Sequence, residues 1–399
     1  MPTRPELEVQ KLLRSVTADS GAGQALVHLY GTYAVQHTFH GEHLNLVLLK
    51  YRQGESPMDL RLVQECRGLI LDMDDDWNVV AMPYTKFWNA GDELADQIDW
   101  RTAQVWEKLD GSLICLFYYK GKWHVSTSGV PDASCRVGDH GMSFAELFWQ
   151  AVVSDDGYSC TRWLDALDPC RCYMFELCSA YNRVVVKQDL KPKIYLHGVR
   201  NLVTLEEEDP RDHARRIGVD TPSYFYLSSL DRCLEAAKIL DPLKQEGFVV
   251  CDSKFRRVKI KSPAYIALHY LADLRSSKKK ISLLIRDGES EEFEKALTAF
   301  PEFKPVFEDL KSRYESYVTN VVKAWDSVAG FPRTKEGQKE FAQEVVFMGP
   351  AYSTVLFELR KRGCDVTGHD IRQSVKSILK DMRVSAYMNK VMKIEESEG

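Results

Sequence analysis

The stretch Trp106-Glu107-Lys108-Leu109-Asp110-Gly111-Ser112 decides how the rest of the chain is read. It stands between Gln104–Trp106 and Leu113–Tyr119, two runs rich in residues that favour β-strands. Asp110-Gly111 is a turn dipeptide, because glycine reaches positive φ at little cost. A lysine at such a turn projects its amine from the end of a sheet, and a neutral amine is a nucleophile. Lys108 is therefore the candidate nucleophile, and Asp110 the residue that orients its turn.

The short motif needs support from the rest of the chain. Average residue frequencies place Lys-x-Asp-Gly by chance in about one chain in ten of this length. A surface lysine beside a hairpin turn is the alternative interpretation, and the downstream residues must exclude it.

The composition is that of an ordinary globular protein with room for two domains. The chain has 399 residues, of which 44% are hydrophobic and 28% charged. Its formal net charge of -5 means that nucleic-acid contacts would come from local basic patches. It lacks an apolar run of membrane-span length and a signal-peptide core. Ten scattered cysteines without a Cys-x-x-Cys pair indicate reduced thiols. We expect a cytoplasmic or nuclear monomer that binds no membrane.

Apolar and alternating runs predict strands in the first two thirds of the chain and helices in the last third. The expected strands are Ala25–Tyr30, Leu44–Tyr51, Cys66–Asp72, Trp77–Pro83, Lys122–Gly129, Cys172–Cys178, Asn182–Val186, Ile194–Val199, Glu246–Val250 and Phe255–Ser262. Helical periodicity marks Glu6–Val16, Ser143–Val153 and most of the chain after about Tyr265. We predict an α+β fold: a sheet-based domain over residues 1–270 and an all-α domain over residues 271–399.

Several charged residues occupy positions where their charge must be balanced by other groups once the protein is folded. Glu176 interrupts an apolar strand, which is costly unless the carboxylate meets a donor or a metal. Lys259 and Lys261 share one strand face and repel each other unless an anion lies between them. Lys86 precedes Phe87-Trp88, a combination suited to a nucleotide's phosphate and base. Each segment alone also fits a solvated strand face.

In this order, the segments resemble the covalent nucleotidyltransferase superfamily of polynucleotide ligases and RNA capping enzymes. Within it, the chain looks most like the phage-type RNA ligase 1 family. The matching motifs are Lys108–Ser112 (motif I), Phe175-Glu176 (III), Lys193–Val199 (IIIa), Glu246–Val250 (IV) and Val258–Ser262 (V). Arg67-Gly68 and Lys86–Asn89 match two elements more particular to this family. The resemblance spans roughly residues 40 to 270 and is specific because many weak matches fall in one order.

The resemblance implies a nucleotidyltransferase domain built on antiparallel sheets and an ATP-dependent RNA ligase that works through lysyl-AMP. Its partners would be RNA with 5′-phosphate and 3′-hydroxyl ends, tRNA being one candidate. Lys108 would attack ATP, Glu246 would hold Mg²⁺ or Mn²⁺, and Glu176 would bind the ribose. The resemblance also implies phosphate contacts for four cations, Lys259, Lys261, Arg67 and Lys86. Trp88 would contact the adenine. Gly111 and Gly247 would belong to the nucleotide-binding motifs.

Two departures limit the resemblance. Family members often carry a lysine after Ser-Thr in the return strand, where this chain has Ser128, so that contact is absent or comes from elsewhere, Lys122 being a candidate. The helical C-terminal region matches nothing with confidence, so substrate preference does not transfer. The alternatives are a tRNA-splicing ligase that requires a 2′-phosphate, a DNA ligase, a capping guanylyltransferase, and an inactive nucleic-acid-binding relative.

Overall fold

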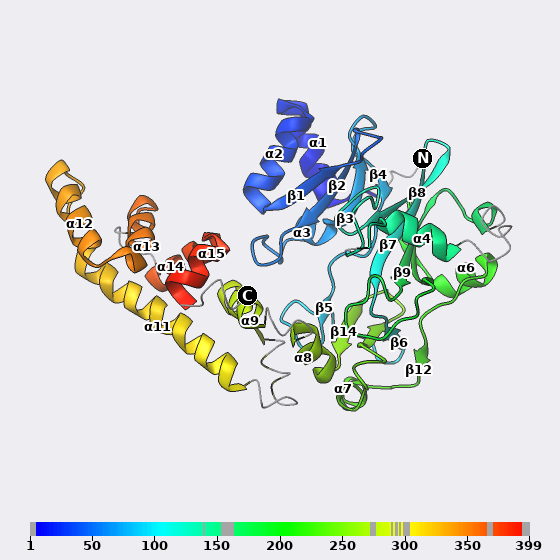
Figure 1. The fold of residues 1–399 in the computed structure, drawn as a ribbon. Coiled ribbons are helices and arrows are strands. Elements are labelled where there is room, and N and C mark those ends of the chain that lie inside the picture. Colours follow the sequence, from blue (N-terminus) through cyan, green and yellow to red (C-terminus); the bar gives the residue numbers. More distant parts are fainter. Residues whose placement is uncertain are drawn as a thin grey trace. The chain divides into compact units, whose positions relative to one another are not determined.

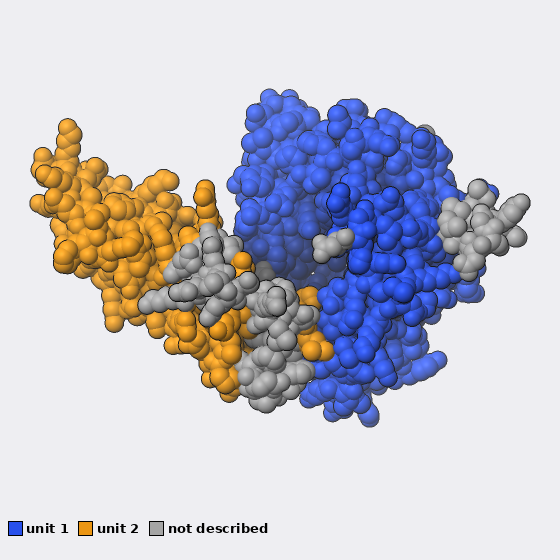
Figure 2. Space-filling model, viewed as in Figure 1, with its two compact units in different colours: residues 1–265 blue, residues 266–399 orange. Residues whose placement is uncertain are grey.

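The computed structural model divides into two compact units, residues 1–265 and residues 266–399, coloured separately in Figure 2. It describes residues 5–138, 140–152, 163–271, 277–288, 304–364 and 370–392, together with residues 290, 291, 294 and 297. Residues 272–276, just after the predicted domain boundary at residue 270, fall outside the described residues, as do residues 393–399.

Unit 1 opens with two helices that cover a four-stranded antiparallel sheet (Figure 1). The helices are α1 (Glu8–Ser20) and α2 (Ala22–Tyr33), and a short α3 (Arg61–Glu65) follows later. The strands of this first sheet are β1 (Val35–Phe39), β2 (Leu46–Tyr51), β3 (Arg67–Asp72) and β4 (Asn78–Ala81), paired in chain order. Buried side chains from both helices pack on β2 and β3.

The strand predicted at Ala25–Tyr30 is wrong, because this segment lies in α2. Its buried residues are Ala25, Leu26 and Leu29, whose spacing places them on one side of a helix. A six-residue apolar run does not distinguish a buried strand from one turn and a half of helix. The neighbouring helix α1 and the sheet decide the outcome, since they bury this face.

Two five-stranded sheets complete unit 1. The second sheet has the order β11-β10-β9-β7-β8, and the third has the order β12-β6-β13-β14-β5. Strands of the second sheet are β7 (Ser112–Tyr119), β8 (Lys122–Thr127), β9 (Arg171–Cys178), β10 (Lys193–Asn201) and β11 (Glu207–Glu208). Strands of the third are β5 (Trp88–Asn89), β6 (Gln104–Lys108), β12 (Tyr224–Phe225), β13 (Gly247–Cys251) and β14 (Arg257–Lys261).

Along each strand of these two sheets, successive side chains point to opposite faces. The second sheet packs one face on α4 (Phe144–Val152) and α6 (Pro210–Ile217) and the other face on the first sheet. The third sheet packs Val105, Phe248, Val250 and their neighbours on α7 (Leu230–Lys238). Residues between these core positions, such as Trp106 and Val249, therefore point to the opposite face.

The strand predicted at Asn182–Val186 is also wrong, because these residues form a loop between β9 and β10. Val185 and Val186 are both buried, but neither belongs to a strand. Their backbone N–H groups donate to the Asp110 side chain and not to a neighbouring strand. This loop is thereby tied to the lysine turn.

In the described part of unit 2, all regular elements are helical. They are α8 (Pro263–Leu271, which begins at the end of unit 1), α9 (Ser277–Asp287), α11 (Lys304–Val328), α12 (Lys335–Phe347), α13 (Pro350–Lys361), α14 (Ile371–Asp381), α15 (Val384–Tyr387) and the π-helical η2 (Met388–Met392). Their core includes Leu310, Tyr314, Val318 and Trp325, which lie along one side of α11. The predicted α+β class, with antiparallel sheets followed by helices, is confirmed. Among the described residues, no helix has the length and apolarity needed to cross a membrane.

Candidate active site

A cavity of about 540 Å³ is lined by the second and third sheets of unit 1, a volume in the usual range of roughly 300–1,000 Å³ for small-molecule sites. Trp106 and Lys108 line it from β6, and Val249 lines it from β13. Leu113, Glu176 and His197 line it from β7, β9 and β10. Arg67, Tyr84 and Phe87 also reach it, as do Arg211 and Arg257.

Lys108 is the last residue of β6 and meets Glu246 across the third sheet. Lys108 pairs in register with Gly247 on β13, so the residue before Gly247 lies beside the lysine. Lys108 Nζ donates to Glu246 Oε2 at 2.7 Å, and the Glu246 side chain is 6% exposed. The candidate nucleophile and the candidate metal ligand are therefore one buried ion pair.

The charge on Lys108 is stabilised by three carboxylates. Burial lowers the pKa of this amine, but the attraction of Glu246, Glu176 and Asp110 outweighs burial, and the pKa of Lys108 is raised. For Glu246, burial raises the pKa of the carboxyl, while Lys108 and Lys261 oppose that rise. The ion pair with Glu246 therefore favours the protonated form of Lys108, and the amine carries its proton at neutral pH.

Asp110 is buried and holds three donors around the lysine turn. Its Oδ2 accepts from the N–H groups of Val185 at 2.8 Å and Val186 at 2.6 Å. Its Oδ1 accepts from the Tyr265 hydroxyl at 2.8 Å. These contacts tie Asp110 to the loop after β9 and to Tyr265, and its role in orienting the turn stays a prediction.

Gly111 is needed for space and not for positive φ. The glycines with positive φ do not include it, which corrects the reason given from the turn dipeptide. A Cβ at this position would lie 2.5 Å from the Leu177 carbonyl oxygen and 2.9 Å from Cys178 Sγ. Gly111 therefore lets the lysine turn approach β9, which carries Glu176.

Arg67 and Glu176 enter the cavity from different sheets. Arg67 begins β3, and its guanidinium lies 5.6 Å from the Phe87 ring centroid. Its buried Nη1 has no hydrogen-bond partner among the residues that the structure describes. Glu176 Oε2 lies 3.6 Å from His197 Nε2. His197 is itself held by the Tyr84 hydroxyl, which donates to the His197 carbonyl at 2.6 Å. The cavity thus offers a cation and a carboxylate to a bound molecule.

Lys259 and Lys261 lie on the face of β14 opposite the core, as their alternation predicts, although neither is among the residues that line the cavity. Lys259 pairs with Val249 and Lys261 pairs with Gly247, while Val258 and Ile260 enter the core beneath α7. A Cβ on Gly247 would lie 2.1 Å from the Ile260 carbonyl, so close strand packing requires glycine there. Both lysines therefore lie on β14, and β13 separates this strand from β6 and Lys108.

Lys86 and Trp88 lie beside each other but outside the lining of this cavity. Lys86 Nζ lies 4.8 Å from the Trp88 ring centroid and 5.2 Å from that of Tyr51. It also donates to Gln53 Oε1 at 3.1 Å. The predicted contacts of Lys86 with phosphate and of Trp88 with adenine remain predictions.

Trp106 and Arg211 are cavity residues to which the sequence reasoning gave no role. Trp106 is two residues before Lys108, so strand alternation alone places both side chains on one face. The Arg211 guanidinium lies 5.6 Å from the Trp106 ring centroid. Arg211 follows Pro210 at the start of α6, and no local motif indicates that this helix reaches the cavity.

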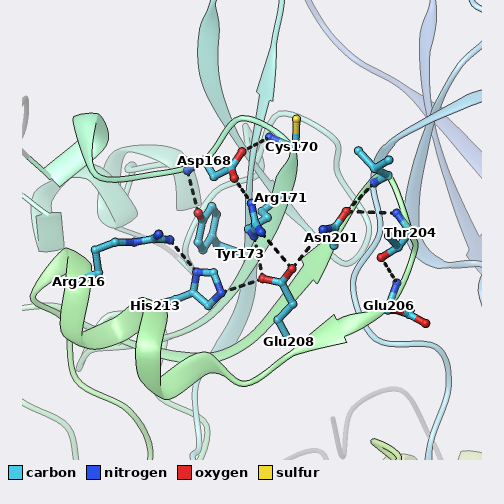
Figure 3. Close-up of polar contacts among 11 residues, drawn as sticks. Asp168, Cys170, Arg171, Tyr173, Asn201, Thr204, Glu206, Glu208, His213 and Arg216 are labelled. Carbon is cyan, nitrogen blue, oxygen red and sulfur yellow. Dashed lines mark hydrogen bonds and ion pairs between the residues drawn. The ribbon is translucent and has the colours of Figure 1, made fainter.

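A polar network holds α6 against the second sheet (Figure 3). Glu208 accepts from Arg171 Nε at 2.7 Å and from Asn201 Nδ2 at 3.2 Å, and it lies 2.8 Å from His213 Nε2. Arg216 Nη2 lies 2.9 Å from the other nitrogen of the His213 ring. The network joins β9 and β10 to the helix whose first turn carries Arg211, and so fixes that end of the cavity.

The residues present fit a nucleotide and a divalent ion. The unpartnered Arg67 Nη1 is a donor available for a phosphate or another acceptor. Among the described residues, no three His, Cys, Asp or Glu side chains form a metal cluster. One carboxylate, Glu246, still suffices for magnesium or manganese, because Mg²⁺ is commonly bound by one or two carboxylates, water and substrate phosphates.

A family model described as RNA ligase matches residues 65–265, about half of the chain. This match covers the lysine turn, Glu176, Glu246 and both lysines of β14.

Two curated proteins extend the similarity into the helical unit. The chain is 30% identical over 326 residues to a protein of Autographa californica nuclear polyhedrosis virus named "Putative bifunctional polynucleotide kinase/RNA ligase", covering 77% of this chain. It spans 45% of that viral protein. It is 27% identical over 349 residues to an RNA ligase of Rhodothermus phage RM378, covering 70% of this chain and 77% of the phage protein.

Solved structures give weaker likenesses. An archaeal ATP-dependent RNA ligase matches with a TM-score of 0.44 and 12% identity over 85% of this chain and 90% of its own. A Naegleria gruberi RNA ligase crystallised with AMP and Mn matches with a TM-score of 0.33 and 15% identity over 41% of this chain and 51% of its own. At these scores the structural likenesses carry no argument about the site.

Proposed function

Since the chain belongs to the RNA ligase family, we propose that it is an ATP-dependent RNA ligase that joins 3′-hydroxyl and 5′-phosphate RNA ends. The observation that carries this proposal is the position of Lys108, in the wall of a nucleoside-sized cavity and 2.7 Å from Glu246. A solvated lysine beside a hairpin turn would have neither feature. Both features therefore favour Lys108 as a nucleophile over that alternative.

In the first step, Lys108 Nζ attacks the α-phosphorus of ATP. The N–P bond forms as the α–β phosphoanhydride bond breaks, and pyrophosphate leaves with the bonding electron pair. Lys108 must lose its proton beforehand, although neighbouring carboxylates raise its pKa. Lys259 and Lys261 supply positive charge on the same sheet, which offsets the negative charge of the phosphates and of the transition state.

In the second step, an oxygen of the RNA 5′-phosphate displaces Lys108 from the AMP phosphorus, and the amine regains a proton. In the third step, the RNA 3′-hydroxyl attacks the 5′-phosphorus and AMP leaves. Glu176, which lines the cavity from the second sheet, would bind ribose hydroxyls, with His197 as its neighbour. Arg67 offers its unpartnered Nη1 to a phosphate.

A magnesium or manganese ion would be held by Glu246, directly or through water, and would supply positive charge to the phosphates. A metal ion bound to Glu246 would share the negative charge of this carboxylate and so weaken the attraction that keeps Lys108 protonated.

Residues 1–270 would carry adenylylation, and residues 271–399 would contribute to the choice of RNA, with tRNA as one candidate. We expect a monomer, since the lysine turn, both β14 lysines and Glu246 come from one chain. The phage and baculovirus relatives named RNA ligase support an RNA substrate.

The test is incubation with α-labelled ATP, magnesium and RNA ends of each type. Wild-type protein should acquire an acid-labile, alkali-stable label and seal 3′-hydroxyl to 5′-phosphate RNA. Lys108→Ala should acquire no label, whereas labelling of that variant at the wild-type level would refute the assignment. Labelling by GTP, joining of DNA alone, or a requirement for a 2′-phosphate would favour a capping enzyme, a DNA ligase or a tRNA-splicing ligase respectively.

A further inference from the structure

The loop between β9 and β10 carries an excess of positive charge beside the lysine turn. Residues 183–193, which we name the basic loop, read Arg-Val-Val-Val-Lys-Gln-Asp-Leu-Lys-Pro-Lys. They contain four cations and one carboxylate in a chain of net charge -5. The carboxylate, Asp189, is paired with Lys193 at 2.8 Å. A protein with a negative net charge needs such a local basic patch in order to bind a nucleic acid.

The basic loop is anchored to the residues around the nucleophile. Val185 and Val186 are buried and donate to Asp110, two residues from Lys108. Gln188 Nε2 donates to the Asp110 carbonyl at 3.1 Å, and Lys187 N–H donates to the Leu243 carbonyl at 2.9 Å. Just before the loop, Asn182 Nδ2 donates to Ser112 Oγ at 3.0 Å. The loop backbone is therefore held in place beside the active site.

The side chains that are not part of this anchor face solvent. Arg183 and Lys187 are exposed and flank the buried pair Val185 and Val186. Val184 is 39% exposed and Leu190 is 70% exposed, although both are apolar. Exposed cations in a loop that is held in place can contact the phosphates of a single strand.

We propose that the basic loop binds the phosphate backbone of the RNA strand whose end is being sealed, with Arg183 and Lys187 as its phosphate contacts. This inference rests on the proposed ligase function and adds the place where the polymer lies. Because the loop is tied to Asp110, RNA bound there is held at a set distance from Lys108. The preorganised backbone lowers the entropic cost of that placement.

The test compares two double variants that remove the same charges. Arg183→Gln/Lys187→Gln alters the basic loop. Arg232→Gln/Lys238→Gln removes one exposed arginine and one exposed lysine from α7, which packs on the core face of the third sheet. Each full-length protein is assayed for binding of a 5′-phosphorylated single-stranded RNA across a salt titration, and for labelling by α-labelled ATP without RNA.

The loop variant should bind this RNA about 25-fold more weakly at about 0.1 M salt than wild type does. Its slope of log K against log salt should be smaller by about 1.4, or 0.7 for each lost phosphate contact. Its labelling by ATP and the RNA binding of the α7 variant should match wild type. Equal RNA affinity and slope in the loop and α7 variants would overturn the proposal. So would parallel loss of labelling and RNA binding, since the loop would then only support the lysine turn.

The RNA-binding measurement does not depend on catalysis, which keeps the two proposals distinguishable. A wild-type protein that binds RNA through the loop but neither labels with ATP nor seals ends would refute the ligase function and support the loop assignment. If the wild-type protein seals RNA and the loop variant binds RNA as tightly as wild type does, the ligase function would be supported and the loop assignment refuted.

Discussion

Lys108 Nζ lies 2.7 Å from Glu246 Oε2, although 138 residues separate them in the chain. The pair joins the nucleophile to the carboxylate that would hold a metal. Glu246 also favours the protonated form of the amine, because its negative charge raises the pKa of Lys108. Two of the following predictions concern the chemistry of this pair.

Glu246→Gln should lower the pKa of Lys108. The variant removes the strongest attraction that opposes burial of the ammonium. The reaction of Lys108 with an amine-specific reagent, followed by peptide mapping over a pH series, should therefore begin at lower pH than in wild type. Lys238, which is exposed on α7, serves as the internal control and should not shift. An unchanged profile for Lys108 would mean that the ion pair does not set its protonation.

Glu246→Gln and Lys259→Gln should differ in their response to metal. The first weakens the hold on the ion, so its adenylylation defect should ease at high metal concentration and depend on the choice of magnesium or manganese. The second removes a fixed cation from the phosphates, which no added metal replaces, at a cost of about 3–4 kcal/mol of transition-state stabilisation. Adenylylation rates across both metal titrations decide this. An identical response would contradict the separate roles.

Trp106→Ala should raise the KM for ATP more than Trp88→Ala does. Trp106 lines the cavity, and Trp88 lies outside its lining beside Lys86. An aromatic contact with a base contributes about 1–3 kcal/mol, so the KM should rise roughly fivefold to 150-fold for Trp106→Ala. If Trp88→Ala instead produced the larger rise in KM, the adenine would lie at Trp88 as the sequence reasoning expected.

A chain ending at Leu271 should still form lysyl-AMP and should seal RNA less well or with altered preference. It retains Tyr265, whose hydroxyl donates to Asp110 at 2.8 Å. A chain ending at Ser262 lacks that donor and should lose adenylylation as well, because a buried carboxylate loses one of its partners. Labelling and sealing assays on the two proteins separate these effects.

Tyr265→Phe in the full chain is the matched control for the shorter truncation. It removes the same hydrogen bond and leaves α8 in place, so its adenylylation rate should fall while its stability falls by about 1.5–3 kcal/mol at most. Full and unaltered sealing by the chain ending at Leu271 would show that the C-terminal helices have no part in substrate choice.

Local sequence was enough for the strands that carry the chemistry. The alternation at Val258-Lys259-Ile260-Lys261 placed both lysines on one face, and β14 bears this out, because a strand has a strict period of two. Local sequence failed at Ala25–Tyr30, where a short apolar run fits helix and strand alike, and at Asn182–Val186, whose backbone partners come from Asp110. A run of β-branched residues indicates a preference for strand structure. It does not determine which groups accept the hydrogen bonds from its backbone N–H groups.

The sequence by itself determined the candidate nucleophile, the order of the charged residues and the two-part division into sheets and helices. Only the tertiary structure decided that Glu246 pairs with Lys108, that Trp106 lines the cavity while Trp88 does not, and that the basic loop is fastened to Asp110. These relationships depend on strand register and on contacts between residues far apart in the chain. Register follows from the packing of whole sheet faces, so no local pattern around Lys108 contains it.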